Sequence, residues 1–156
     1  MTTKIGIRQA QKWDLWGLEV MLAKGIQESD GLLPDYDDLH FAHVAMNLIA
    51  AGLVFVAVEV SEDGKQEKLL GCLYLDGKKW AWNPEVTILE SVHFYVLPEA
   101  RGKQLADGKT AIWEGLLQAG QALADRSGCA MIIHIMHKLD DRATAKDELF
   151  KRAGLH

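Results

Sequence analysis

The sequence predicts one compact α/β domain. Runs rich in β-branched residues alternate with longer amphipathic runs in the order β-α-α-β-β-β-α-β-α, which is typical of packed layers of helices and sheet. No repeat, linker or low-complexity segment divides the 156 residues, so residues 1–156 form a single domain. Hydrophobic residues make up 49% and charged residues 25% of the chain, enough apolar material for a real core.

The first third of the chain predicts a strand followed by two helices. Alternation over Lys4–Arg8 indicates the strand. We expect Asp14 to cap a helix that ends at Gly25, and a second helix to run from about Asp37 to Ala51. Their predicted apolar faces contain Leu15, Trp16, Leu18, Met21 and Leu22 in the first helix, and Leu39, Ala42, Met46 and Ile49 in the second.

The middle of the chain predicts three strands. Leu53–Val60 and Leu69–Leu75 are joined by a polar turn and form an antiparallel hairpin. A loop over Trp80–Pro84 leads to a long strand over Thr87–Leu97, which Pro98 ends.

The last third predicts the longest helix, a buried strand and a final helix. Apolar residues recur at helical spacing from about Gly102 to Ser127, and Gly128 ends that helix. The apolar run Ala130–Met136 indicates a buried central strand. The final helix begins at Asp140 or Asp141 and ends near residue 154.

Charge and hydropathy exclude several function classes. The formal charge of −5 argues against a basic nucleic-acid-binding surface. The longest nearly apolar run, residues 48–58, is too short to span a membrane and no signal peptide is visible, so we expect a cytoplasmic protein without a membrane partner. Cys72 and Cys129 lack a C-x-x-C partner or a nearby ligand set, so we expect two free thiols and no metal site.

One segment carries the chemical signal. After the long strand the chain reads V-L-P-E-A-R-G-K-Q-L-A over residues 96–106, and this stretch, in this order of elements, resembles the GNAT superfamily of N-acetyltransferases over almost the whole chain. The resemblance implies a mixed, mostly antiparallel twisted sheet with helices on both faces. It also implies acetyl-coenzyme A as co-substrate, its pyrophosphate held by backbone N–H groups of a [Q/R]-x-x-G-x-[G/A] loop before a helix. Carried onto this chain, the loop residues are Arg101, Gly102, Lys103, Gln104, Leu105 and Ala106, with Gln104 replacing the usual middle glycine.

The resemblance also assigns roles along the long strand. A bulge there would splay two strands, so that backbone groups near Tyr95 and Val96 pair with the pantetheine arm. Glu90 stands where several members place the carboxylate that deprotonates the amine, directly or through water. His93 is a second candidate base, on the opposite face unless a bulge intervenes. Alternatively Glu90 faces solvent or an arginine, and His134 and His137 are satisfied core or edge residues.

The chain departs from the family near its end. Phe150 replaces the tyrosine that in many members protonates the leaving thiolate. Either Tyr95 or water then supplies the proton, or the thiolate leaves unaided. The chain stops at His156, where the family adds a hairpin that is missing or short here. Met131–Met136 would then lack a neighbour, and we expect a second copy in a homodimer, or residues beyond His156, to cover it.

The function implied is transfer of an acetyl group from acetyl-coenzyme A to a primary amine, either a small cationic amine or a protein lysine. Five carboxylates that would attract such an amine lie between the first two helices: Glu28, Asp30, Asp35, Asp37 and Asp38. The simpler interpretation is a solvated loop with helix caps, and Trp80 and Trp82 either flank the same mouth or pack as lids. The alternatives are a fold that binds coenzyme A without turnover and a structural or partner-binding protein.

Overall fold

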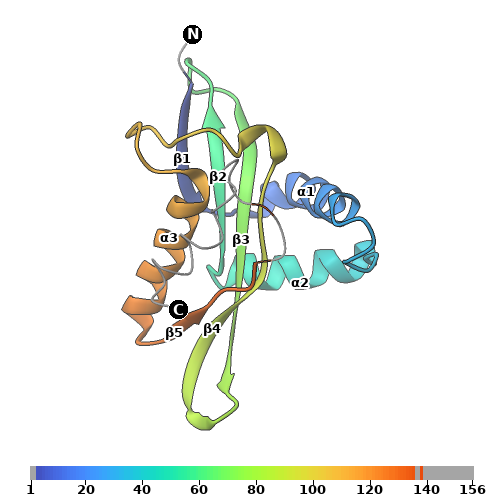
Figure 1. Ribbon diagram of the computed structural model, residues 1–156, viewed down its shortest axis with the longest axis vertical. Coiled ribbons are helices and arrows are strands. Elements are labelled where there is room, and N and C mark those ends of the chain that lie inside the picture. Colours follow the sequence, from blue (N-terminus) through green and yellow to red (C-terminus); the bar gives the residue numbers. More distant parts are fainter. Residues whose placement is uncertain (1–2, 136–137, 139–156) are drawn as a thin grey trace.

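The protein forms a five-stranded sheet in the order β1-β2-β3-β4-β5 (Figure 1). The computed structural model describes residues 3–135 and 138. The strands are β1 (Lys4–Gln9), β2 (Val54–Val60), β3 (Glu67–Trp80), β4 (Asn83–Val96) and β5 (Ala130–Ile132). Neighbouring strands are antiparallel except for β4 and β5, which are parallel.

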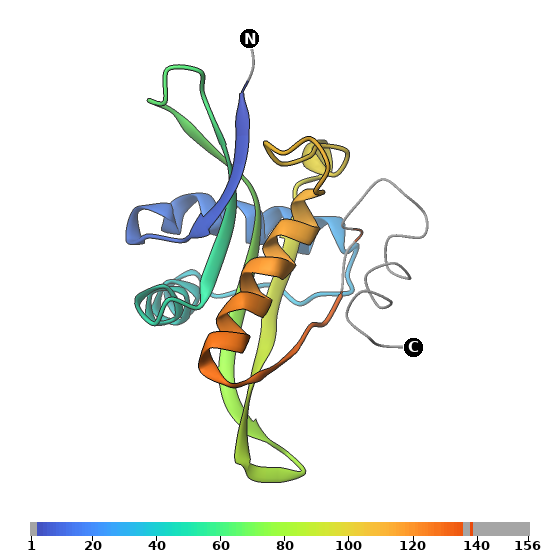
Figure 2. The same cartoon turned by 90° about the vertical axis from the view of Figure 1, so that its left-hand side faces the viewer.

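Helices cover both faces of this sheet (Figure 2). The helices are α1 (Leu15–Glu28), α2 (Asp38–Ala50) and α3 (Ile112–Ser127), with short 3₁₀ turns η1 (Lys12–Asp14) and η2 (Pro98–Ala100). Helices α1 and α2 lie on one face and α3 on the other. The predicted mixed, mostly antiparallel sheet between helices is confirmed through β5, and the predicted final helix, with Phe150, lies outside the described residues.

The buried helix faces differ from those we predicted. In α1 the buried residues are Leu18, Met21 and Gly25, whereas Trp16 is 79% exposed. Trp16 lies two residues from Leu18, about 200° around the helix, which turns it to solvent. In α2 the buried residues are Ala45 and Leu48, and the predicted core residues Leu39 and Met46 are exposed. Contact with the sheet, and not the position of the largest apolar side chains, determines which face of α1 and of α2 is buried.

The longest helix begins ten residues later than predicted, at Ile112 and not at Gly102. Residues 101–111 instead fold into a tight loop, in which the Leu105 N–H donates to the Thr110 carbonyl at 2.8 Å. The Asp107 carboxylate accepts from the Lys109 and Thr110 N–H groups at 2.8 and 2.9 Å. Because the Asp107 side chain satisfies these two backbone N–H groups outside a helix, its bonds compete with helix formation in this segment. Gly128, with φ of 68°, ends α3 as predicted.

The strands around the predicted site also have different lengths. The predicted loop at Trp80–Pro84 is mostly strand, since β3 runs to Trp80 and β4 starts at Asn83, forming the long hairpin at the bottom of Figure 1. Strand β5 ends at Ile132 and not at Met136, and residues 133–135 are not strand. Within the described residues β5 is an edge strand, half-exposed, and not a buried central one.

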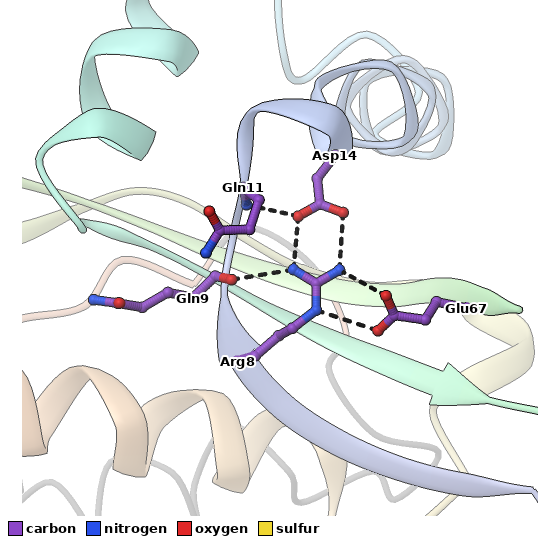
Figure 3. A network of polar contacts seen from close by, with 5 residues as sticks. All are labelled: Arg8, Gln9, Gln11, Asp14 and Glu67. Carbon is purple, nitrogen blue, oxygen red and sulfur yellow. Dashed lines mark hydrogen bonds and ion pairs between the residues drawn. The ribbon is translucent and has the colours of Figure 1, made fainter. Parts of the chain in front are cut away.

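A polar network fixes the start of α1 to the sheet (Figure 3). Arg8 of β1 donates to both carboxylate oxygens of Asp14, at 2.7 and 3.0 Å, and to Glu67 of β3. Asp14 also accepts from the Gln11 N–H at 2.7 Å, so it anchors the turn before α1 and makes no side-chain cap bond to the helix itself. Burial raises the pKa of Asp14, but the bonds from Arg8 and Gln11 outweigh it, and the net pKa is lowered.

Candidate active site

A bulge in β4 brings the predicted catalytic residues to one face of the sheet. Opposite β3, His93 pairs with Tyr74 and Ser91 pairs with Leu75, so Val92 is the extra residue and the register shifts there. Because directly opposed residues share a face, and the bulge offsets the alternation by one, Glu90, His93 and Tyr95 all lie on the side of α1 and α2. The bulge implied by the resemblance is therefore present, and it intervenes between Glu90 and His93.

Strands β4 and β5 diverge just beyond Glu90. Their parallel ladder pairs Ile88, Leu89 and Glu90 with Ala130, Met131 and Ile132, and ends there. Beyond it the two segments separate, as Figure 2 shows. His134 still contacts β4 beyond the ladder, since its N–H donates to the Ser91 hydroxyl at 2.7 Å. Glu90 therefore sits at the point where the two strands part.

Glu90 is the centre of a charged cluster at this point, which we call the Glu90 cluster (Lys78, Glu90 and His134). Lys78 forms an ion pair with the Glu90 carboxylate, and His134 Nε2 lies 3.2 Å from Glu90 Oε2. Hydrogen bonds from Lys78 and then from His134 lower the pKa of Glu90, so the carboxylate is ionised at neutral pH. We expected His134 to be a core or edge residue, and its contact with Glu90 could not be predicted because it depends on the register between β4 and β5.

Tyr95 belongs to a second cluster, between β4 and α1, which we call the Arg101 cluster (Glu28, Tyr95 and Arg101). Arg101 binds both carboxylate oxygens of Glu28, and its Nε donates to the Val96 carbonyl at 3.0 Å. The guanidinium lies 5.6 Å from the centre of the Tyr95 ring. The Tyr95 hydroxyl donates to Glu28 Oε2 at 3.4 Å, and burial above all raises the pKa of Tyr95 to about 12. The Arg101 side chain is therefore engaged inside the protein.

His93 lies between two tyrosine rings on the same face. Its ring centre is 5.8 Å from that of Tyr95, in a stacked arrangement, and 5.9 Å from that of Tyr74, in an edge arrangement. Burial raises the pKa of Tyr74. His93 is half-buried in this aromatic row, whereas Glu90 stands at its more open end.

The predicted phosphate loop uses several of its own N–H groups internally. The Lys103 N–H donates to Ala100, the Leu105 N–H to Thr110 and the Ala106 N–H to Ile5. Gln104 forms an isolated bridge with Ala111, and the Lys103 side chain lies 3.3 Å from Glu59. Residues 102–104 and 106–109 are exposed. Because α3 begins at Ile112, the helix start lies after this loop and not within it.

The carboxylates between α1 and α2 mostly serve local structure. Glu28 is paired with Arg101, and Asp37 caps α2 by accepting from the His40 N–H at 2.8 Å. Asp35 and Asp38 each accept from the N–H of the following residue. Trp80 and Trp82 lie at the far end of the β3–β4 hairpin, where Trp82 is 83% exposed. These positions agree with the simpler interpretation of caps and solvated residues.

Residues 3–135 and 138 contain no group of three or more metal-ligating side chains. Cys72 and Cys129 are free thiols, and burial raises the pKa of the Cys72 thiol to about 12. Among the described helices none combines the length and the apolar character needed to cross a bilayer.

No protein-family model and no curated protein matches the chain. Solved structures do match it over nearly its full length. A predicted acetyltransferase from Clostridium acetobutylicum, solved with acetyl-CoA, has a TM-score of 0.68 and 15% identity, over 97% of this chain and 90% of that one. The aminoglycoside N-acetyltransferase AAC(6')-Iy, solved with CoA, has a TM-score of 0.65 and 19% identity, over 100% and 90%. A GCN5-related N-acetyltransferase from Ralstonia eutropha JMP134 has a TM-score of 0.61 and 18% identity, over 97% and 92%. The chain thus has the GNAT fold that its sequence led us to expect.

Proposed function

We propose that the protein is an acetyl-CoA-dependent N-acetyltransferase that acts on a primary amine. The observation that carries the proposal is the β4 bulge at Val92 together with the divergence of β4 and β5, which leaves the ionised Glu90 where the strands part. The reaction forms a bond from the amine nitrogen to the acetyl carbon, breaks the bond from that carbon to sulfur, and releases one amine proton to a base and one thiolate. Acetyl-CoA, when bound, supplies the activated thioester.

The residues that would hold the co-substrate are those along β4 and at the start of α3. The backbone near Tyr95 and Val96 is proposed to run beside the pantetheine arm, as an added strand would lie. For the pyrophosphate, the residues proposed from the sequence are 101–106, and the structure adds a second candidate. This candidate is the first turn of α3, where a helix start carries a partial positive charge, with the exposed Lys109 three residues before it.

The Glu90 cluster supplies the basic groups that a cationic amine needs. An ammonium cannot attack a thioester until it loses a proton, and an ionised carboxylate with an adjacent imidazole provides both attraction for the cation and a proton acceptor. His93, the second proposed base, is half-buried between the rings of Tyr74 and Tyr95.

Release of the thiolate does not depend on Tyr95 in this proposal. The Tyr95 hydroxyl donates to Glu28 within the Arg101 cluster, so its proton is already engaged in a hydrogen bond. A thiol has an ordinary pKa of about 8.5, so a thiolate is a tolerable leaving group near neutral pH and can be protonated by water. Tyr95 then acts mainly by shaping the wall of the site.

The acceptor class is proposed to be a small cationic amine, with a protein lysine as the other choice. Two structures with this fold are aminoglycoside N-acetyltransferases, AAC(6')-Iy and AAC(6')-Ih from Acinetobacter baumannii, and an aminoglycoside is a polyamine. The formal charge of −5 favours any cation over an anionic acceptor.

A second candidate function is coenzyme A binding without turnover. It is favoured by the loop at residues 101–111, whose Gln104 and internally bonded N–H groups differ from the pattern that the resemblance leads us to expect. Homodimerisation through the β5 edge also remains a prediction, which light scattering tests directly.

Thermal unfolding with acetyl-CoA tests the proposal first. At about 100 times its dissociation constant, a ligand stabilises the native state by about 2.7 kcal/mol, which for a domain of this size raises Tm by about 5–10 °C. Release of free thiol, followed across a panel of polyamines, aminoglycosides and lysine peptides, then tests turnover. Stabilisation without thiol release would favour the binding protein, and absence of both would contradict any coenzyme A function.

The position of the phosphates is tested by Lys109→Glu. We expect this variant to weaken acetyl-CoA binding about tenfold or more, because it places negative charge before α3. Lys79→Glu, on the projecting hairpin, is the matched control with the same change in net charge and should bind as the parent does. Ala106→Asp separates the two proposed positions, since a strong loss there would assign the phosphates to residues 101–106.

A further inference from the structure

We propose that His134 is the proton acceptor for the amine and that Glu90 is a positioning residue that orients the His134 ring. The inference rests on the proposed function. His134 stands at the divergence of β4 and β5, its Nε2 is 3.2 Å from Glu90 Oε2, and its side chain is 57% exposed. It is thus both anchored by a carboxylate and open to a reactant.

The backbone places His134 on the correct face. Glu90 pairs with Ile132 in the parallel register, and the contact of His134 Nε2 with Glu90 Oε2 places the His134 ring on the Glu90 side of the sheet. The His134 N–H donates to the buried Ser91 hydroxyl at 2.7 Å, which fixes its main chain beside the bulge. Two separate bonds from neighbouring residues of β4 therefore hold the histidine, one to its ring and one to its backbone.

Glu90 is the weaker candidate for the acceptor itself. Its carboxylate already accepts from Lys78 and faces His134, and these bonds lower its pKa. A base of lowered pKa takes a proton from an ammonium less readily than an imidazole, which is the side chain whose charge changes near neutral pH. In the tautomer that donates from Nε2 to Glu90, Nδ1 carries the lone pair available for the proton.

The charged groups around His134 fit the proposed step, in which the ring takes up a proton and then releases it. Glu90 faces it from β4, while Lys78 pairs with Glu90 from β3 and the exposed Asp76 stands opposite Glu90 in the register. His93 follows on the same face of β4 beyond the bulge. The ammonium gives one proton to Nδ1, the neutral amine attacks the acetyl carbon, and the imidazolium, paired with Glu90, returns its proton to solvent. The nitrogen of the new amide loses its second proton to water, and coenzyme A leaves as the thiolate.

Three variants test this assignment: His134→Gln, Glu90→Gln, and the control His43→Gln on the exposed face of α2. A general base contributes roughly 10²–10⁴-fold, so His134→Gln should lower kcat by about 10² or more and remove the acid limb of its pH profile. Glu90→Gln should lower kcat by about tenfold and keep the acid limb, because His134 is still present but its ring is no longer oriented by a carboxylate. Exogenous imidazole should partly restore His134→Gln. His43→Gln should behave as the parent.

Two readouts separate this inference from the proposed function. The thermal shift with acetyl-CoA should be the same in the parent and all three variants, which shows that they fold and bind. Turnover by the parent with a His134→Gln rate within twofold of it, or an acid limb that Glu90→Gln alone abolishes, would overturn the role of His134 and leave the acetyltransferase intact. A parent protein that binds acetyl-CoA but releases no thiol with any amine would overturn both.

Discussion

Two clusters on the same strand and the same face of the sheet have opposite characters. The cation and the ring of the Arg101 cluster are buried, since Arg101 is 9% exposed and the Tyr95 side chain is fully buried, while the Glu28 side chain is 29% exposed. The Glu90 cluster begins five residues earlier on β4 and is open, with Lys78 49% and His134 57% exposed. Both contain a carboxylate between a cation and a ring, so composition does not distinguish them.

Burial decides what each cluster can do. A buried guanidinium that satisfies a carboxylate and a main-chain carbonyl holds α1 to β4, and its loss leaves those partners without compensation. The Glu28 and Glu90 side chains are similarly exposed, at 29% and 26%, so the clusters differ in the burial of the partners of these carboxylates. The exposed Lys78 and His134 can exchange partners with water or a reactant at little cost. We therefore assign stability to the first cluster and chemistry to the second, and the following changes test that division.

The largest expected effect is on the Arg101 cluster. Arg101→Ala should lower the free energy of unfolding by about 2–4 kcal/mol, because the Glu28 carboxylate and the Val96 carbonyl both lose their donor. Urea unfolding followed by circular dichroism measures it. Arg101→Lys should have a free energy of unfolding between those of the parent and Arg101→Ala, because lysine keeps the positive charge but cannot donate in two fixed directions at once. Lys78→Ala, in the open cluster, is the matched change and should cost less than about 1 kcal/mol. Equal losses for the two alanine variants would contradict the comparison.

A smaller effect is expected for Tyr95→Phe. The hydroxyl makes a long bond of 3.4 Å to Glu28, so its removal should cost about 0.5–1.5 kcal/mol while the ring continues to pack under Arg101. We expect kcat to stay within about threefold of the parent, measured by thiol release. A loss of a hundredfold in a variant of normal stability would return the acid role to Tyr95.

The smallest effect concerns the pH dependence of stability in the open cluster. Lys78 and His134 lower the pKa of Glu90 in the folded state, so its contribution is present above the ordinary glutamate pKa of about 4.3 and is lost as the pH falls through the lower folded value. Glu90→Gln should therefore show a shallower loss of Tm between about pH 5 and pH 2 than the parent. If Tm fell equally with pH in the parent and in Glu90→Gln, the bonds from Lys78 and His134 would not lower the pKa of Glu90 in the protein in solution.

Local sequence determined the order of elements, the antiparallel β2–β3 hairpin and the glycine end of α3, because β-branched runs, turn residues and Gly128 act over a few neighbours. It also placed Glu90 and His93 on the strand that carries the bulge. Local pattern misplaced the start of α3, since Leu105 fits the helical spacing while the Asp107 carboxylate closes a turn that stops a helix there.

Only the tertiary structure decided which side chains meet. The bulge at Val92 reverses the alternation of β4, and the parallel register of β5 sets His134 beside Glu90, a contact across more than forty residues of chain. The same holds for Arg101, which the resemblance places at the start of the phosphate loop and whose side chain the fold directs to Glu28 of α1. Strand register and helix docking are set by long-range packing, and a one-residue shift in strand register moves every side chain of that strand to the other face of the sheet. For that reason the sequence predicted the strand on which the chemistry is proposed to lie, and the fold selected the partners of its residues.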